Sequence, residues 1–233
     1  MQSGDHSGIS MLRALVAGAA LALVGCSSEA HTDEKPPPVA DDGIANDGNY
    51  APGPYGVVQG KTIANYEFLG FVNPLADSST LQTIKLGDFY NPTGSEVFPE
   101  GSLYGAGKPK PKALLINVSA VWCGPCQYEA DEILPVEYAK YKPLGGEFLL
   151  ELADGPTPGT AALEKHLSAW TNKYDVDYPS TIDPQYQLGA LFEAAAYPGN
   201  MIVRTKTMAI VAIVSGAPDQ VFWGEFEGLL EEP

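Results

Sequence analysis

Basic residues and cysteines are both scarce in this chain. Its 233 residues include 13 Lys and Arg against 29 Asp and Glu, which gives a formal net charge of −16. This balance excludes a nucleic-acid binder held by phosphate contacts and docking onto an anionic membrane through basic patches. Three cysteines are too few for a disulfide-stapled scaffold. Apolar residues make up 45% of the chain, enough for a sizeable core, which excludes disorder throughout.

The apolar run near the start of the chain is too short to cross a bilayer as a helix. Residues 14–24 form a run of 11, which spans about 16 Å as a helix, roughly half of a bilayer core. A single cation, Arg13, precedes the run, and Leu23-Val24-Gly25-Cys26 ends it. This organisation is typical of a signal peptide, with Met11 as the expected start.

The four residues that end this run resemble the bacterial lipoprotein signal. The resemblance implies that residues 1–25 are removed and that Cys26 becomes the acylated first residue of the mature chain. Acyl chains on Cys26 would then anchor the protein to the membrane. Ser27 follows, where an Asp would favour retention in the inner membrane, so a slight preference for the outer membrane is expected. An ordinary secretory signal with an incidental cysteine is the alternative.

Residues 26–57 are poor in apolar side chains and rich in Pro, Gly and acidic residues. Such a segment cannot bury enough surface to offset the entropy lost on ordering. The run Pro36-Pro37-Pro38 favours an extended polyproline II conformation. We therefore expect a flexible tether, in which His31 is exposed rather than a metal ligand.

From residue 58 onward, segments typical of strands and helices alternate. Strands are expected at 65–71, 113–120, 147–153, 200–203 and 209–214, and a weaker strand or a turn at 83–89. Helices are expected at 130–141, 160–174 and 185–195 and after Pro218, with a kink or break at Pro135. Residues 91–112 are rich in Gly, Pro and Lys and predict a loop. The order of elements predicts an α/β fold over residues 58–233, with a mixed central sheet and helices on both faces.

A CxxC motif lies where the apolar strand at 113–120 gives way to a helix. In the segment Trp122-Cys123-Gly124-Pro125-Cys126, the second cysteine follows the first by one helical turn, so the two sulfurs can bridge. The N-terminus of a helix favours thiolate over thiol, which lowers the pKa of a cysteine placed there. We expect an exposed, nucleophilic Cys123 and a deeper Cys126 that resolves the mixed disulfide.

In this setting the motif resembles the thioredoxin superfamily, and most of all its membrane-tethered TlpA/ResA-like branch. The resemblance covers roughly residues 60–233 and implies a thioredoxin-like fold and thiol–disulfide exchange. It also implies a cis-proline facing the dithiol, and Pro198, directly before an apolar strand, matches that position. A trans proline that begins a strand is the alternative. The substrate-binding residues implied are Trp122, Gly124, Pro125, Tyr197 and Pro198.

Two polar residues match further positions of this branch. Glu129, three residues after Cys126, corresponds to a glutamate that relays the proton of the second cysteine. A surface glutamate is the alternative. Asn117 stands where cytoplasmic thioredoxins carry a buried aspartate, which leaves Glu129 as the better candidate for the relay. The chain departs from the family at Gln127, where a basic residue is frequent, and at Tyr197, which replaces a smaller residue.

Two other functions compete with thiol–disulfide exchange. A copper-handling module similar to the Sco proteins would use a CxxxC motif and a distant histidine, but this chain has CxxC, and His166 fits the boundary of an amphipathic helix better. A zinc site would need two further ligands. The third possibility is a redox-inactive binding domain with a structural disulfide. We predict no metal and no cofactor.

The resemblance also indicates partners and compartment. Clients would be disulfide-containing exported proteins, and a membrane thiol-electron donor would supply electrons in an oxidising compartment. The sequence therefore predicts a lipid-anchored protein-disulfide oxidoreductase of the bacterial cell envelope that faces the periplasm and acts as a reductant.

Overall fold

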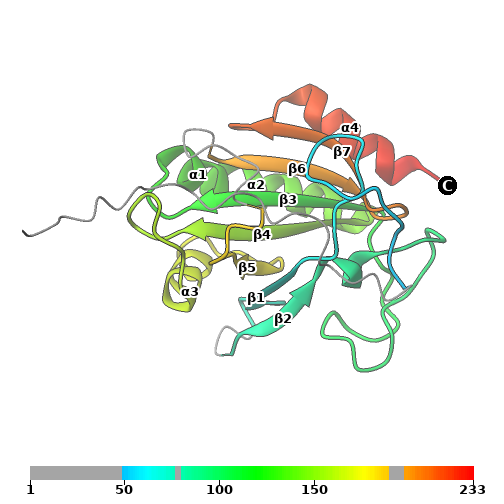
Figure 1. Cartoon of the computed structure of the whole chain (residues 1–233), viewed down its shortest axis with the longest axis horizontal. Coiled ribbons are helices and arrows are strands. Elements are labelled where there is room, and N and C mark those ends of the chain that lie inside the picture. The colour runs from blue at the N-terminus through cyan, green and yellow to red at the C-terminus, as the bar shows by residue number, and fades with distance from the viewer. Residues whose placement is uncertain (1–48, 77–79, 189–196) are drawn as a thin grey trace, which may run out of the picture. The chain divides into compact units, whose positions relative to one another are not determined.

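The computed structural model describes residues 49–76, 80–188 and 197–233. A seven-stranded mixed sheet organises them, in the order β2-β1-β5-β4-β3-β6-β7 (Figure 1). The pairs β3–β4 and β4–β5 are parallel, and the other neighbours are antiparallel. The strands are β1 (Glu67–Phe71), β2 (Gln82–Lys85), β3 (Ala113–Ala120), β4 (Gly146–Asp154), β5 (Ser180–Ile182), β6 (Gly199–Arg204) and β7 (Ala209–Ser215). The predicted α/β fold with a mixed central sheet and helices is confirmed.

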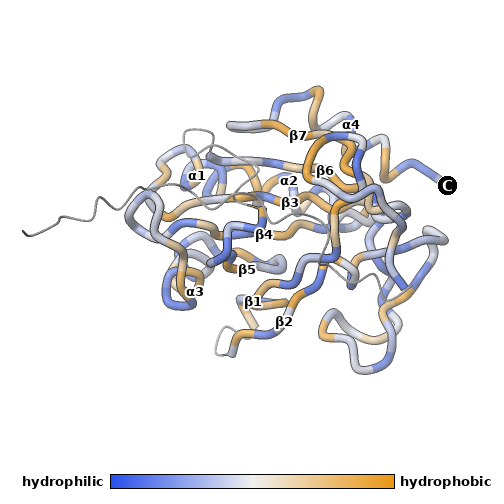
Figure 2. Tube along the Cα trace, in the orientation of Figure 1, coloured by the Kyte–Doolittle hydropathy of each residue, from blue (hydrophilic) through white to orange (hydrophobic). Residues whose placement is uncertain are grey.

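The centre of the sheet follows from the apolar runs of the sequence. Every residue of β3 and β4 is buried, as expected for strands with neighbours on both sides and cover on both faces. Figure 2 shows hydrophobic residues along β3 and β6, and more polar stretches along β1 and β2 at one edge. The β6–β7 hairpin expected from the last two apolar runs is also present.

The helices are α1 (Gly124–Tyr128), α2 (Leu134–Tyr141), α3 (Glu164–Lys173) and α4 (Gln220–Glu231). Helices α2 and α4 cover the same face of the sheet, because the ring of Phe148 on β4 packs against Tyr138 of α2 and against Trp223 and Phe226 of α4. Helix α3 packs against β5. Within the described residues, no helix is long and apolar enough to cross a membrane.

The helix after the CxxC motif changes geometry before Pro135. A π-helical turn, Glu129–Ile133, joins α1 to α2, and the Leu134 N–H donates to the carbonyl of Glu129. Pro135 lies in the first turn of α2, and because it has no N–H, the ladder of hydrogen bonds of the continuous helical run is interrupted there. The expected kink therefore takes the form of a π turn, a feature often found at functional sites.

Several expectations need correction. The helix expected at 160–174 begins only at Glu164, because residues 157–161 fold back on the end of β4 through bonds such as Gly155 N–H to Thr160 O. Strand β5 was not expected, since a three-residue strand carries little periodicity. Of the helix expected at 185–195, residues 185–188 form turns, and the rest lies outside the described residues.

The expected tether ends earlier than residue 57. Tyr50 and Ala51 are buried, the Tyr50 hydroxyl donates to the carbonyl of Ile63, and the Tyr55 hydroxyl donates to the carbonyl of Ala51. These aromatic anchors make residues 50–57 part of the folded domain, so the boundary expected at residue 58 is placed too late. The expected signal peptide, Cys26 and most of the tether lie outside the described residues.

The predicted loop at 91–112 is confirmed, and its own side chains hold it in place. Phe98 stacks on Tyr104 at 4.8 Å between ring centroids, and Tyr104 meets Phe89 edge-on at 5.1 Å. The buried Asn91 amide donates to the carbonyls of Lys110 and Pro111, which ties the two ends of the loop together.

Candidate active site

The CxxC motif bridges the end of the central strand and the start of a helix. Strand β3 ends at Ala120, and Cys123 is the N-cap residue of α1. Cys123 and Cys126 form a disulfide with an S–S distance of 2.10 Å. The backbone N–H of Cys126 donates to Cys123 Sγ at 3.1 Å, so the first cysteine sulfur occupies the position of a helix-capping acceptor.

The oxidised pair is less accessible than expected. Cys123 is 2% exposed and Cys126 is fully buried, so the prediction of an exposed Cys123 is wrong for this oxidised form. The reason is the direction of its sulfur, which turns into the helix end toward the Cys126 N–H. Gly124 and Pro125, between the cysteines, are exposed. The turn formed by Gly124 and Pro125 therefore faces solvent, and the disulfide lies beneath it.

Trp122 and Tyr197 lie together beside the motif, although 75 positions separate them in the sequence. Their rings meet edge-to-face, with centroids 5.9 Å apart. The peptide bond between Tyr197 and Pro198 is cis, as expected. Burial, and then the carboxyl groups of Asp154 and Glu151, raise the pKa of the Tyr197 hydroxyl well above its ordinary value. Tyr197 therefore stays protonated in this site.

Asp154, at the end of β4, holds Trp122 in place. Its Oδ2 accepts a hydrogen bond from Trp122 Nε1 at 2.9 Å and another from the Gly159 N–H at 2.9 Å. Asp154 was not predicted from the sequence. The available signal was its position, because parallel strands β3 and β4 end at the same edge of the sheet and an acidic residue closing β4 must lie beside the motif that follows β3.

Glu129 is buried, which rejects the alternative of a surface glutamate. It is 1% exposed and lies one helical turn after Cys126. Its Oε2 accepts from Asn117 Nδ2 at 2.7 Å, and its Oε1 accepts from Asn200 Nδ2 at 2.9 Å. Burial raises the pKa of Glu129 to about 7, although the two amide hydrogen bonds act in the opposite direction. A carboxyl group with such a pKa can accept and release a proton near neutral pH.

No protein-family model and no curated protein matches this sequence. Solved structures do match. A candidate thiol:disulfide interchange protein DsbE from Chlorobium tepidum aligns with a TM-score of 0.53 and 15% identity over 75% of this chain and 99% of that chain. A secreted thiol-disulfide isomerase from Corynebacterium glutamicum aligns with a TM-score of 0.50 and 16% identity over 81% and 96%. The thioredoxin domain of a Bacteroides vulgatus thiol-disulfide oxidoreductase aligns with a TM-score of 0.50 and 13% identity over 76% and 100%.

The chain has a thioredoxin-like fold. The fold implied by the resemblance of the CxxC motif is thus confirmed. At these low sequence identities, the similarity concerns the fold alone. Within this thioredoxin-like fold, the motif at the end of β3, the cis bond before β6 and the buried Glu129 are all contributed by different elements.

His166, the histidine considered for a metal-handling module, has a structural role at the start of a helix. His166 Nδ1 accepts a hydrogen bond from the Leu163 N–H at 3.1 Å, so this histidine caps the start of α3. Among the described residues, no group of three or more His, Cys, Asp or Glu side chains is arranged to hold a metal. Nothing in this geometry favours copper handling over thiol chemistry.

A cavity of about 530 Å³ lies at the other end of the thioredoxin-like fold. Its walls include Tyr104, Lys110 and Tyr138, together with Gly146 at the start of β4. Because the dithiol follows the end of β3 whereas this cavity adjoins the beginning of β4, the two are at opposite ends of the same parallel strand pair. None of the predicted site residues lines the cavity.

Proposed function

We propose that this protein is a thiol–disulfide oxidoreductase, anchored by a lipid in the bacterial cell envelope, that reduces disulfides of exported proteins. The observation that carries the proposal is the Cys123–Cys126 disulfide at the start of α1 in a thioredoxin-like fold. Proteins of the same fold from three bacteria bear names of thiol-disulfide oxidoreductases or isomerases, which agrees with this chemistry.

The reaction consists of two exchanges that together transfer two electrons. The Cys123 thiolate attacks one sulfur of a client disulfide, which forms a mixed disulfide and releases the other client sulfur as a thiolate. The Cys126 thiolate then attacks Cys123 Sγ, which closes the Cys123–Cys126 disulfide and releases the second client thiolate. The dithiol is oxidised and the client disulfide is reduced. A membrane dithiol donor would restore the reduced protein.

The geometry supports Cys123 as the nucleophile. A backbone N–H at the helix start points at its sulfur, and such a donor stabilises a thiolate more than a thiol. The helical run that begins here continues through the π turn to the end of α2. Cys126 is fully buried, which suits attack on an adjacent mixed disulfide rather than on a client.

Glu129 is the proposed proton acceptor for Cys126. Both residues face the interior from successive turns of one helix, and residues three apart on a helix are neighbours. In its carboxylate form Glu129 takes the Cys126 proton, which generates the attacking thiolate. In its neutral form Glu129 returns a proton when the pair is reduced again.

The client is proposed to lie across the exposed turn and the cis-proline segment. Gly124 and Pro125 are exposed, and the ring of Trp122, next to Cys123 in the chain, packs edge-to-face against Tyr197. Backbone groups of Tyr197 can pair with an extended client strand, as in recognition by strand addition. The Tyr197 ring narrows access in comparison with a small residue, which favours unfolded or extended clients over bulky folded ones.

The location rests on the sequence. Leu23-Val24-Gly25-Cys26 supplies the lipidation signal, and Ser27 favours the outer membrane. The acidic, proline-rich residues after Cys26 would hold the domain away from the bilayer.

The test uses the full chain and a model peptide with one disulfide. Cys123→Ser is expected to abolish reduction, because the nucleophile is lost. Cys126→Ser is expected to accumulate a mixed disulfide, because nothing resolves it, and mass spectrometry of the trapped species in cells identifies clients. Cys26→Ser serves as the matched control: it keeps reductase activity and loses membrane association. Full activity of Cys123→Ser would overturn the proposal.

A further inference from the structure

Asn200 donates a hydrogen bond to Glu129, the proposed proton acceptor, although 71 positions separate the two residues in the sequence. It lies on β6 directly opposite Asn117 in the antiparallel β3–β6 ladder, so both side chains project from the same face of the sheet. Both are buried, with exposures of 0% and 1%, and both amides donate to the Glu129 carboxyl group. Asn200 has no part in the CxxC motif and was not predicted as a site residue.

The donors of the two amides are all used. Asn117 Nδ2 donates to Glu129 Oε2 and to Asn200 Oδ1, and the Ser119 hydroxyl donates to Asn117 Oδ1. Asn200 Nδ2 donates to Glu129 Oε1 and, at 3.4 Å, to the carbonyl of Gly216. Each carboxyl oxygen thus receives one N–H from a different strand. This arrangement leaves one further lone pair on each oxygen for a proton.

We propose that Asn200 is a positioning residue for proton transfer: together with Asn117 it grips the Glu129 carboxylate at both oxygens and thereby sets the pH range in which Cys126 is deprotonated. The inference rests on the proposed role of Glu129 in dithiol exchange. A neutral amide suits this task, because it stabilises the carboxylate without holding it as firmly as a cation would.

The electrostatic surroundings support this assignment. Burial raises the pKa of Glu129, and Asn200 and Asn117 are the two groups that lower it. Among the described residues, Cys126 lies one turn earlier on the same helical run, and burial followed by the charge of Glu129 raises the pKa of Tyr178. Neither is a cation. The amides are therefore the main means of stabilising the charged form.

Asn200 also connects Glu129 to the proposed client-binding segment. Its amide bonds to the carbonyl of Gly216, and the Gly216 N–H donates to the carbonyl of Pro198 at 2.7 Å. A client strand that engages Tyr197 and Pro198 therefore contacts a segment that is two residues from Asn200 in sequence and joined to it by hydrogen bonds.

The experiment titrates Glu129 directly in the reduced full chain. The ¹³C chemical shift of its side-chain carboxyl is followed against pH in the wild type and in Asn200→Leu, which is similar in size but has no donor. Loss of one hydrogen bond to a charged group is expected to move the midpoint upward by about one pH unit or more. Asn200→Asp has the same shape, and its ionised form lacks the donor and places a second negative charge beside Glu129, so the upper midpoint of the carboxyl pair should lie above the wild-type midpoint.

The rate at which Cys126 resolves a preformed mixed disulfide provides the second readout. The inflection of its pH profile should shift upward with Asn200→Leu, and the rate should recover at pH values above the new inflection. Asn91→Leu is the matched control, since Asn91 is also fully buried and its amide donates to backbone carbonyls of the 91–112 loop. This variant is expected to lower stability and to leave both midpoints unchanged.

Unchanged Glu129 midpoints in both Asn200 variants would overturn the inference, even where the rates fall uniformly. The shift measured by NMR does not depend on turnover. If the wild-type protein fails to reduce disulfides, the proposed function is wrong. The NMR titration still decides whether Asn200 sets the pKa of Glu129.

Discussion

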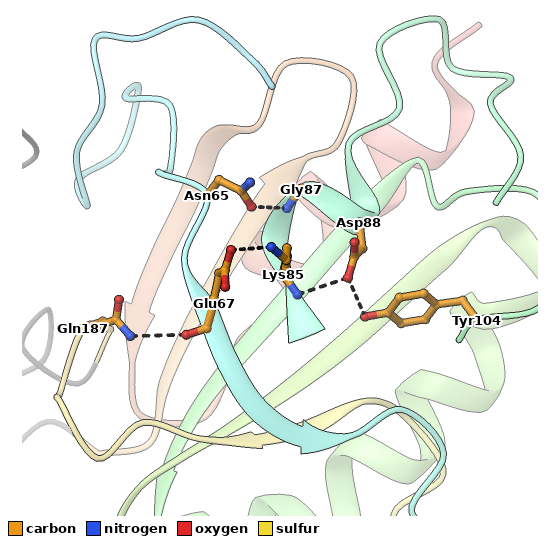
Figure 3. Close-up of polar contacts among 7 residues, drawn as sticks. All are labelled: Asn65, Glu67, Lys85, Gly87, Asp88, Tyr104 and Gln187. Atoms are coloured by element: carbon orange, nitrogen blue, oxygen red, sulfur yellow. Dashed lines mark hydrogen bonds and ion pairs between the residues drawn. The ribbon is translucent and has the colours of Figure 1, made fainter. Parts of the chain in front are cut away.

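A carboxyl group packed over the centre of the sheet and a carboxyl group at its edge have opposite surroundings. At the centre, Glu129 is 1% exposed and is held by two neutral amides. At the edge, Glu67 of β1 forms an ion pair across the ladder with Lys85 of β2, and their side chains are 53% and 46% exposed (Figure 3). Among the described residues, no cation pairs with the central carboxyl group, whereas the edge carboxyl group has a cation as its partner but remains exposed to water.

Local hydrogen bonds organise the edge further. Asp88 Oδ2 accepts from the Lys85 N–H and from the Tyr104 hydroxyl, while Asn65 Oδ1 accepts from the Gly87 N–H at 2.6 Å (Figure 3). These contacts fix the turn that follows β2 and dock the 91–112 loop. The comparison teaches what a carboxyl group meets when it is buried without a cation: at Glu129, burial raises the pKa although two amide hydrogen bonds act against it.

The largest effect is expected on the pH dependence of stability. The pKa of Glu129 rises from an ordinary 4.5 to about 7 in the folded protein. Between these values the unfolded chain loses a proton that the folded protein keeps, so the free energy of unfolding falls as pH rises. The expected loss through this group is about 3 kcal/mol and is complete above pH 7 or so.

Glu129→Gln removes this titration. Urea unfolding of both proteins at pH 4.5 and pH 7.5, in the same redox state, measures the difference between their pH dependences. Equal pH dependence of stability in the two proteins would mean that the pKa of Glu129 is not raised in the folded protein. The difference drawn here between Glu129 and Glu67 would then be wrong.

A smaller effect is expected at Asp154, which positions the Trp122 ring. Asp154→Ala leaves the Trp122 indole N–H and the Gly159 N–H without their acceptor, which costs about 2 kcal/mol of stability. Urea unfolding measures this cost, and Trp122 fluorescence reports the altered ring environment. Asp154→Asn keeps an acceptor oxygen and should lose less.

This variant also sharpens the comparison within the site. The pH inflection assigned to Glu129 should stay in place in Asp154→Ala, since Asp154 contacts Trp122 and not the amide pair. A shift as large as that expected for Asn200→Leu would show that the two buried carboxyl groups act as one unit.

The smallest effect is expected at the edge of the sheet. Glu67→Gln should change the free energy of unfolding by no more than about 0.5 kcal/mol, because exposed ion pairs contribute little. Unfolding in low and high salt checks this, since the small wild-type contribution should vanish as salt screens the pair. A loss above 1 kcal/mol would show that the edge pair matters more than its exposure suggests.

Elements that depend on local sequence patterns were predicted, whereas elements that depend on contacts with distant residues were not. Strand β3 and the β6–β7 hairpin were predicted because their apolar runs are long. Strand β5 was missed because its three residues become a strand only by pairing with β4 and β1. Residues 50–57 looked like tether because their few aromatic anchors find partners only in the folded domain.

The site divides in the same way. Cys123, Cys126 and Glu129 lie within seven positions of one another, so helical spacing alone relates them. Asn200 and Asp154 were not predicted, because nothing near them in the chain marks them as polar groups beside the dithiol. Their roles depend on the register between β3 and β6 and on the common edge at which β3 and β4 end.

The sequence alone determines the local chemistry: a dithiol at the start of a helix, a carboxyl group one turn later and an acidic chain. The surroundings of that carboxyl group were decided only by tertiary structure. Packing removes Glu129 from water and brings amides from two strands, 83 positions apart, to its two oxygens. Burial raises the pKa of Glu129 and the two amide hydrogen bonds lower it. Its pKa in the protein is therefore set only when the chain has folded and both effects are present.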